Sequence, residues 1–310
     1  MTSQAAAQAG AGDQLDWAAS QPEVSIIAPF HNERESLGDL LVEIATALDG
    51  ISMEVIAVDD GSDDGSGSLV AELAQTRPWL HLLRLGVNQG QTAALATGIV
   101  AARGRVIVTI DSDGQNDPRD IPRLLRELDE TGADIVAGRR RRRQESLARR
   151  AVSSVANRLL RRLTGVPIHD TGCSLKAFRA EALQGMRLLR DDHRFLPAIT
   201  AFGRARVHEI WVNDRPRNGG RSHYGYGRIP RVAVDLIGVW ALRRFAGRPL
   251  RAAAWCASLL MVLFLTTSVL LALLHQVALA ILATAAGLSV VLVVIFAAAA
   301  LESVMRFPRR

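Results

Sequence analysis

The sequence predicts an α/β protein with a mostly parallel sheet covered by helices on both faces, followed by a C-terminal transmembrane helical hairpin. Three observations lead to this prediction. Short apolar runs rich in β-branched residues alternate with amphipathic stretches from residue 23 onward, which is typical of parallel sheets. Two of these runs end in the acidic segments DDGSDDGS and DSDGQNDP. Two long apolar runs without charge lie near the C-terminus.

Strands and helices are expected to alternate through the first half of the chain. We expect strands at residues 24–28, 54–58, 80–85, 105–110 and 134–137, and helices at about 34–48, 64–76, 92–102 and 118–130. A glycine-containing loop at 86–91 links the third strand to its helix. No Gly-rich phosphate-binding loop follows the first strand, which disfavours kinases, ATPases and dinucleotide-dependent oxidoreductases.

The cysteines and the uneven charge narrow the class of protein. Cys173 and Cys256 are far apart in the 310-residue chain, so a disulfide framework is not expected and a reducing compartment fits. Cys173 is expected to be a small packed residue. The net charge is +6, and residues 139–143 are five consecutive arginines. Without a helix-turn-helix signature or zinc-ligand spacing, this basic surface indicates a membrane or an anionic substrate and no nucleic acid.

Two uncharged runs, at 252–274 and 277–301, predict the membrane helices. At 1.5 Å per residue each run reaches roughly 35 Å as a helix, enough to cross a hydrocarbon core of about 30 Å. Arginines flank the pair, at 248 and 251 before the first run and at 306, 309 and 310 after the second. The positive-inside rule therefore places both termini, and everything before residue 250, in the cytoplasm.

We divide the chain into five parts. Residues 1–21 are a disordered tail, 22–227 a cytoplasmic domain, 228–247 a juxtamembrane interfacial helix, 252–301 the two transmembrane helices and 302–310 a cytoplasmic basic tail. The interfacial helix is expected because apolar residues at helical spacing are flanked by arginines. The alternative for this segment is a core helix of the cytoplasmic domain.

The segment Asp111-Ser112-Asp113 predicts a metal site at the end of the fourth strand. Carboxylates two residues apart in an extended or turning backbone can face one side and hold a divalent cation against a diphosphate. The alternative is an ordinary Asp-rich turn. The second strand also ends in carboxylates, Asp59 and Asp60. Ligands of parallel sheets bind at the carboxyl ends of the strands, so the two acidic turns are expected to converge there.

An ordered set of motifs carries a family resemblance. The set runs Pro29-Phe30-His31-Asn32-Glu33, DDGSDDGS, DSDGQNDP, DTGCSLKAFR at 170–179, HRFLPAI at 193–199 and RPRNGGRSHYG at 215–225. It resembles the inverting family-two glycosyltransferases, and more narrowly the polyprenyl-phosphate glycosyltransferases of the dolichol-phosphate mannosyltransferase-like branch. The resemblance covers about residues 22–245 and implies a GT-A-like, nucleotide-sugar-binding α/β domain.

The resemblance implies a donor side of the site. Residues matching the nucleotide-binding positions are Pro29, Glu33 and Asp59, with Asp60 beside it. Residues matching the metal and diphosphate positions are Asp111, Asp113 and Gln115, which would bind Mg²⁺ or Mn²⁺. The structural alternatives are a helix N-terminal acid for Glu33, an ordinary turn for Asp59 and Asp60, and a helix cap for Asn116 and Asp117.

The resemblance also implies an acceptor side. Residues matching the phosphate-binding positions are Arg140, Arg149, Ser153, Arg217, Ser222 and His223. Asp170 joins Asp111 and Asp113 as a catalytic residue near the reacting centre. His223 stands where the family pattern has lysine, so its charge depends on protonation. Lys176 and Arg179 are expected to be ordinary surface charges.

These matches imply a metal-dependent, inverting transfer of a sugar to polyprenyl phosphate. The donor is expected to be a UDP-linked hexose or N-acetylhexosamine. The acceptor is expected to be undecaprenyl phosphate, at the inner leaflet of a bacterial cytoplasmic membrane, for envelope glycan or lipid modification. Contacts between membrane helices would also allow a homo-oligomer. The alternatives are a processive polysaccharide synthase, disfavoured because no Gln-x-x-Arg-Trp string occurs, and a non-catalytic membrane adaptor on a transferase fold.

Overall fold

The structure is a computed structural model of the chain and forms two units, residues 1–236 and 237–310. It describes residues 21–141, 154, 157–159, 161–162, 165–185, 196–201, 205–216, 249–273 and 277–304. Residues 1–20 of the predicted tail (1–21), the predicted interfacial helix at 228–247 and residues 305–310 of the basic tail lie outside these residues. The division of the chain into five parts therefore stays a prediction.

Unit 1 is built around a seven-stranded sheet with the strand order β3-β2-β1-β4-β6-β5-β7. Its strands are β1 (Val24–Phe30), β2 (Met53–Asp59), β3 (Leu80–Arg84), β4 (Val106–Thr109), β5 (Ile135–Arg140), β6 (Lys176–Arg179) and β7 (Val207–Val212). Strands β1 to β4 pair in parallel, and so do β5 and β7. Strand β6 pairs antiparallel with both β4 and β5. The predicted mostly parallel sheet is confirmed.

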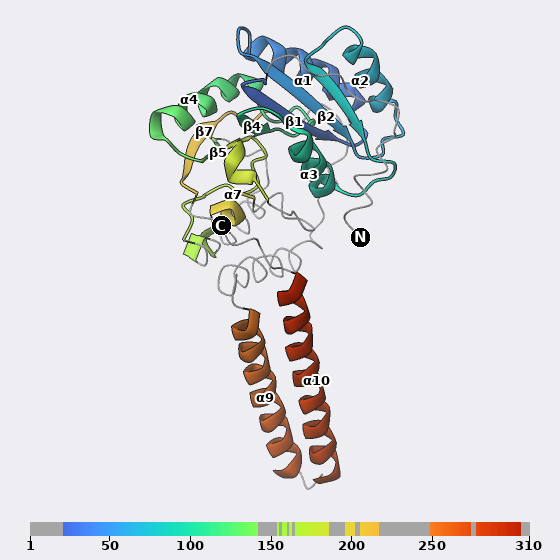
Figure 1. Ribbon diagram of the computed structural model, residues 1–310, viewed down its shortest axis with the longest axis vertical. Coiled ribbons are helices and arrows are strands. Elements are labelled where there is room, and N and C mark those ends of the chain that lie inside the picture. The colour runs from blue at the N-terminus through green and yellow to red at the C-terminus, as the bar shows by residue number, and fades with distance from the viewer. Residues whose placement is uncertain are drawn as a thin grey trace. The chain divides into compact units, whose positions relative to one another are not determined.

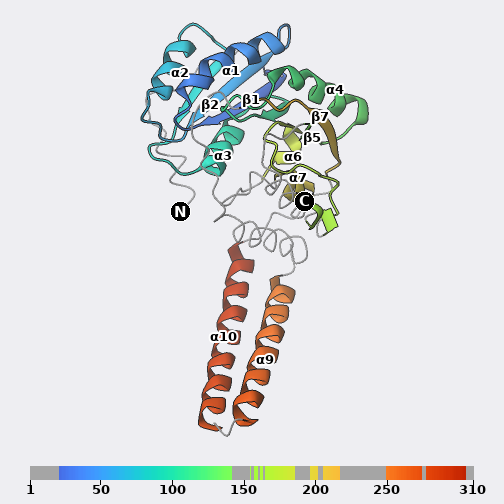
Figure 2. The same cartoon turned by 180° about the vertical axis from the view of Figure 1, so that it is seen from behind.

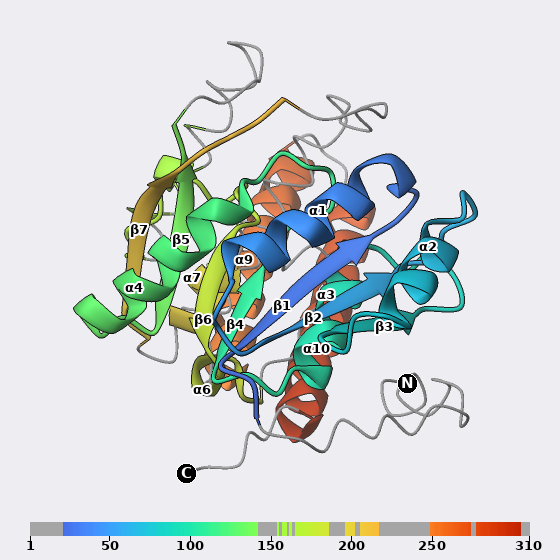
Figure 3. The ribbon, with the colours of Figure 1, turned by 90° about the horizontal axis from the view of Figure 1, so that it is seen from above.

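Helices cover both faces of this sheet, as Figures 1 and 3 show. One face carries α1 (Arg34–Ala47), α2 (Ser66–Ala74) and α4 (Ile121–Thr131), which follows the short 3₁₀ helix η1 (Pro118–Asp120). The other face carries α3 (Gln91–Ala101), α6 (Ala180–Leu183) and α7 (Leu196–Ala201).

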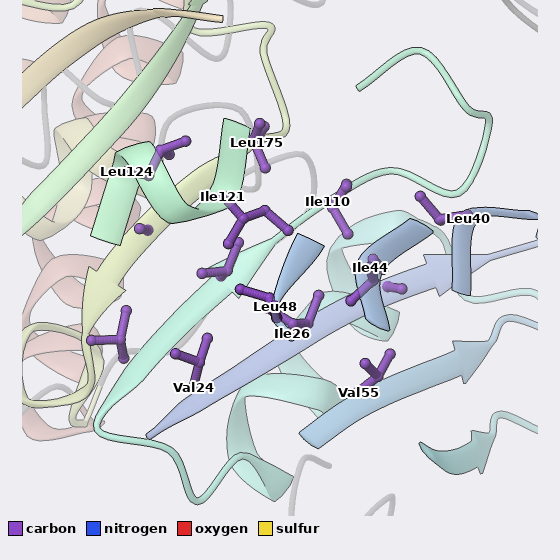
Figure 4. Packing of buried hydrophobic residues seen from close by; sticks show 14 of the residues in the cluster. Val24, Ile26, Leu40, Ile44, Leu48, Val55, Ile110, Ile121, Leu124 and Leu175 are labelled. Carbon is purple, nitrogen blue, oxygen red and sulfur yellow. The ribbon is translucent and has the colours of Figure 1, made fainter. Parts of the chain in front are cut away.

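The alternation of side chains along each strand divides the core in two. Along β1, Val24 and Ile26 face the α1 side, whereas Ile27 faces the α3 side. Figure 4 shows Ile26 of β1 packing close to Ile44 of α1 in the first layer. All residues of β1 are buried, including the polar Ser25, so both faces of the strand are covered.

The predicted elements agree with the structure to within a few residues in the first half of the chain, and β6 and β7 were not predicted. Strand β6 is short and has a charged residue at each end, so it lacks the apolar run that marks the other strands. The prediction that Lys176 is a surface charge is wrong, because β6 lies between two strands and leaves Lys176 only 3% exposed. Arg179 keeps 27% of its side chain exposed.

Unit 2 contains two long apolar helices, α9 (Pro249–Leu273) and α10 (Val277–Val304), which lie side by side (Figure 2). The Ser268 and Thr284 hydroxyls are 2.5 Å apart between them. By length and composition, the described residues contain one helix able to cross a membrane, Ala254–Leu273, and a shorter apolar stretch at Ile281–Val294. The second predicted span therefore stays a prediction.

Candidate active site

The acidic turns predicted from the sequence lie at one edge of the sheet. In the parallel register, Phe30 of β1 pairs with Asp59 of β2, and Ile27 of β1 pairs with Thr109 of β4. The segments that follow these three strands therefore begin at neighbouring positions. Strand β5 runs in the same direction as β4, so Arg140 at its end belongs to the same edge. Asp170 precedes the antiparallel β6 and also lies at this edge.

Hydrogen bonds fix the acidic turn after β4 against β1 and α1. The Ser112 hydroxyl donates to the Pro29 carbonyl at 3.0 Å, and the Ser36 hydroxyl donates to the Ser112 carbonyl at 2.7 Å. Ser112 is buried, whereas Asp111 and Asp113 on either side keep part of their surface exposed. Pro29 thus supports the turn through its carbonyl, a contact that the sequence did not reveal.

Asp111 and Asp113 form a pair of carboxylates that repel each other. Burial, and then repulsion from Asp113, raise the pKa of Asp111 to about 6. The Gln91 amide, at the first residue of α3, donates to Asp111 Oδ1 at 2.6 Å. Asp113 Oδ1 accepts from the Gln115 backbone N–H at 3.1 Å. Gly114 between them has a φ of 75°, which favours glycine.

This donor set fits a divalent metal that is also bound by substrate. Oxygen ligands suit Mg²⁺ and Mn²⁺, and a cation between two repelling carboxylates would relieve the repulsion. Within the described part of the chain, no three His, Cys, Asp or Glu residues gather to hold a metal ion. The two aspartates would therefore leave coordination positions for phosphate oxygens and water.

The carboxylates after β2 mainly shape the neighbouring loops. Asp59 Oδ1 accepts from the Ser62 N–H at 2.8 Å. Asp60 uses both oxygens, accepting from the Gln89 N–H at 2.7 Å and the Gly90 N–H at 2.9 Å. Asp60 therefore holds the loop that leads into α3, where Gln91 reaches Asp111. Its geometry favours the structural reading of this residue, and direct contact with nucleotide stays a prediction.

Glu33 occupies the N-cap position of α1 but makes no side-chain hydrogen bond that caps the helix. Its Oε2 accepts from the Ser36 hydroxyl at 3.2 Å, and its backbone N–H donates to the Ser66 hydroxyl at 3.1 Å. Glu33 is thus held between α1 and α2, beside the ends of β1 and β2. This position is compatible both with nucleotide binding and with a favourable charge at the helix N-terminus.

The structure joins Arg140 and Asp170, two residues predicted separately for the acceptor side. Arg140 Nε donates to Asp170 Oδ2 at 2.9 Å, and Nη2 donates to Oδ1 at 3.1 Å. The side chains are 14% and 1% exposed. Burial opposes the charge of Arg140, but the hydrogen bond and charge of Asp170 outweigh it and raise the pKa of Arg140. The Asp170 N–H donates to Glu209 Oε1 at 2.9 Å, which ties this segment to β7.

Lys176 also lies at this edge, although the sequence analysis placed it at the surface. It pairs with Thr109 of β4 and with Ala137 of β5. The pKa of Lys176 is lowered, mainly because burial disfavours the charged ammonium. The apolar neighbours Leu175, Ala177 and Phe178 are a weak signal of a buried strand, because the charged Lys176 and Arg179 interrupt the run.

Smaller predictions for this region had mixed outcomes. Cys173 is packed as predicted, at 1% exposure, and burial raises the pKa of its thiol to about 12. Asp117 caps η1 by accepting from the Arg119 N–H at 3.1 Å. Asn116 does not cap the helix and instead accepts from the Ser174 hydroxyl at 2.5 Å. The predicted acceptor residues outside the described part of the chain are Arg149, Ser153, Arg217, Ser222 and His223.

Comparisons with known proteins place the chain among sugar transferases. The family model Glycosyl transferase family 2 matches residues 25–187. Dodecaprenyl-phosphate galacturonate synthase of Rhizobium johnstonii is 40% identical over 239 residues, covering 73% of this chain and 69% of the relative. Undecaprenyl-phosphate 4-deoxy-4-formamido-L-arabinose transferase of Salmonella choleraesuis is 35% identical over 224 residues, covering 71% and 68%.

A solved structure shows the same fold. Glucosyl-3-phosphoglycerate synthase from Mycobacterium tuberculosis, in complex with Mn²⁺, UDP and phosphoglyceric acid, matches with a TM-score of 0.56 and 20% identity. The match covers 72% of this chain and 78% of that chain. The predicted GT-A-like fold with a mostly parallel sheet is confirmed for unit 1.

Proposed function

The chain belongs to glycosyl transferase family 2, and on this premise we propose that it transfers a sugar from a nucleotide sugar to polyprenyl phosphate. The proposed donor is UDP-linked, and the proposed acceptor is undecaprenyl phosphate at the inner leaflet of a bacterial membrane. One observation carries the proposal: the carboxylates Asp111 and Asp113 share one sheet edge with the cationic residue Arg140. The names of the two polyprenyl-phosphate relatives support the acceptor.

On the donor side, the chain would bind the nucleotide and steady its leaving group. Asp113 and Gln115, with Asp111, would hold Mg²⁺ or Mn²⁺, whose charge would neutralise the departing diphosphate. Glu33 and Asp59 lie at the ends of β1 and β2, where carboxylates can accept hydrogen bonds from base or ribose. The hydrogen bonds of Ser112 and Ser36 hold this acidic turn in place before substrate arrives, which lowers the cost of reorganisation.

On the acceptor side, the lipid phosphate would attack the anomeric carbon directly. A phosphate oxygen is already ionised at neutral pH, so no strong general base is needed, and one displacement inverts the configuration. The guanidinium fork of Arg140 suits phosphate geometry. Asp170 accepts hydrogen bonds from Nε and Nη2 of Arg140, so the remaining N–H groups of the guanidinium would bind the acceptor phosphate, and we assign Asp170 the role of orienting Arg140.

The apolar helix in unit 2 would keep the enzyme at its lipid substrate. Residues 254–273 are long and apolar enough to cross a membrane, and the arginines at 248 and 251 favour a cytoplasmic start for this helix. A tethered domain raises the local concentration of a membrane-bound acceptor, as linked binding modules do.

Product formation by the full-length protein tests this proposal. Purified protein in nanodiscs is incubated with undecaprenyl phosphate, Mn²⁺ and a panel of nucleotide sugars, and the lipid is analysed by mass spectrometry. We expect a glycosyl phospholipid with one donor, lost when EDTA is added and lost in Asp113→Asn. Asp49→Asn, an equal change at an exposed position, should leave the product yield unchanged.

The opposite results identify the alternatives. No lipid product from any donor would refute the transferase proposal. Absence of metal-dependent nucleotide binding in the same protein, measured by calorimetry with UDP and Mn²⁺, would favour a non-catalytic adaptor.

A further inference from the structure

Lys176 is a buried cation on the antiparallel strand β6. It is 3% exposed and sits between Thr109 of β4 and Ala137 of β5. Its neighbour Phe178, two residues on, packs in the core layer on the α3 side of the sheet. Because residues two apart in a strand share a face, Lys176 also lies on the α3 side.

The same face carries the first aspartate of the acidic turn. Asp111 follows Thr109 by two residues and receives the Gln91 hydrogen bond from the start of α3. Asp111 and Asp170 are the carboxylates whose charges act on Lys176. Lys176 thus stands between the acidic turn of the donor side and the Arg140–Asp170 pair of the acceptor side.

In the part of the chain that the structure describes, Lys176 lacks the hydrogen-bond partners that a buried structural charge such as Glu54 has. Glu54, at 1% exposure, accepts from the Ser25 hydroxyl at 2.5 Å and from Arg103 Nε and Nη2 at 3.0 and 2.9 Å. Among the described residues, no hydrogen bond or salt bridge to the Lys176 ammonium is present, and the ammonium is not one of the fully buried atoms without a partner, so a ligand can reach it. A lysine is seldom buried without a partner, because burying an unpaired charge is costly. A ligand that completes the ammonium's hydrogen bonds explains why this lysine is tolerated.

We propose that Lys176 is a phosphate-binding residue of the reaction centre, whose ammonium donates to a phosphate oxygen of a bound substrate. This inference rests on the proposed function, which supplies two sources of phosphate oxygen: the diphosphate of the nucleotide sugar and the phosphate of the lipid acceptor. Lys176 lies between the groups assigned to each of them. The compact ammonium of Lys176 would bind one phosphate oxygen, whereas the planar guanidinium of Arg140 can bind two.

The substitution Lys176→Met tests the proposal, because it keeps a long side chain and removes the charge. Arg179→Met on the same strand is the matched control, since Arg179 donates to the carbonyls of Ala133 and Leu128 at 3.0 and 2.9 Å. Full-length proteins in nanodiscs are compared by calorimetry with UDP and Mn²⁺, by kinetics with undecaprenyl phosphate, and by melting temperature without ligands.

For Lys176→Met we expect either a UDP affinity that is about 10- to 100-fold weaker or a KM for undecaprenyl phosphate that is about 10- to 100-fold higher. This is the size of effect expected for the loss of one charged hydrogen bond. A change in UDP affinity assigns the contact to the donor, and a change in the acceptor KM alone assigns it to the lipid phosphate. Its melting temperature should be equal to or higher than that of the wild type. Lys176→Arg should recover most of the affinity. Arg179→Met should melt lower and bind both substrates normally.

Several results would overturn the inference. Unchanged UDP affinity and unchanged acceptor KM in Lys176→Met would do so, and so would a Met variant that fails to fold, because both outcomes make Lys176 a structural residue. These results are distinct from failure of the proposed function, in which the wild type itself makes no lipid product. If the wild type binds UDP without making product, the UDP affinity of Lys176→Met still tests the role of Lys176. If the wild type binds no UDP, both the inference on Lys176 and the proposed function are overturned.

Discussion

Removing the guanidinium of Arg140 should destabilise unit 1 strongly, because it takes the opposite charge and two hydrogen bonds away from a buried carboxylate. Asp170 is 1% exposed, and its side chain accepts three hydrogen bonds from Arg140, two from the guanidinium and one from the backbone N–H at 3.2 Å. Of these three hydrogen bonds, Arg140→Met leaves the one from the backbone N–H. Breaking a buried ion pair on one side costs about 3–5 kcal/mol. For a unit of this size, that lowers the melting temperature by roughly 6–20 °C.

The neighbouring arginine provides a matched control. Arg139 Cζ lies 4.1 Å from the ring centroid of Trp211, and Trp211 is 44% exposed. An exposed cation–π contact is worth about 0.5–1 kcal/mol, so Arg139→Met should lower the melting temperature by only a few degrees. The full-length variants are compared in nanodiscs by tryptophan fluorescence on heating and by urea titration at 25 °C.

A double substitution shows whether Arg140→Met loses stability because the Asp170 charge loses its counter-ion or because of a general packing defect. Arg140→Met combined with Asp170→Asn removes both charges, so the double variant should be more stable than Arg140→Met alone. If Arg140→Met costs no more than Arg139→Met, or if the double variant loses the sum of both single losses, the electrostatic explanation is refuted.

Two further substitutions probe the acidic edge. Asp60→Ala removes the acceptor of the Gln89 and Gly90 N–H groups; it should speed hydrogen exchange at these amides and weaken UDP binding, whereas unchanged exchange would contradict the assigned contacts. The pKa of Asp111 is raised to about 6 in the folded state, so the fold favours the protonated carboxyl. This stabilisation, about 3 kcal/mol, is fully present below about pH 4 and is lost as the pH rises through 6. In EDTA, Asp111→Asn should therefore melt higher than the wild type at pH 7.5 and equally at pH 4; a lower melting temperature at pH 7.5 would count against this.

The local elements near the N-terminus were predictable because their signals are local. The run at 24–28 is apolar and β-branched, and the structure extends it to Val24–Phe30. The acidic turns after β2 and β4 were predictable as partners because parallel strands place their carboxyl ends at one edge. The sequence also indicated a packed Cys173, since a small apolar-like residue among buried neighbours has few other roles.

The contacts that define the site depended on tertiary structure. Asp170 and Arg140 are 30 residues apart, and nothing local shows that they form an ion pair. Asp60 looked like a nucleotide ligand from its motif, yet its oxygens hold the loop before α3. Lys176 looked like a surface charge because the insertion of β6 between β4 and β5 cannot be deduced from a four-residue segment.

The reversed direction of β6 has a consequence for how this segment can change in evolution. Because β6 runs against its neighbours, the chain enters the sheet at the reactive edge, bringing Asp170 and Lys176 there together. A parallel strand of this length would begin about 13 Å away, at the opposite edge. Inserting or deleting one residue between 170 and 176 would turn Lys176 to the other face or shift Asp170 away from Arg140. Relatives that keep this chemistry should therefore vary in residue type along this stretch but not in its length.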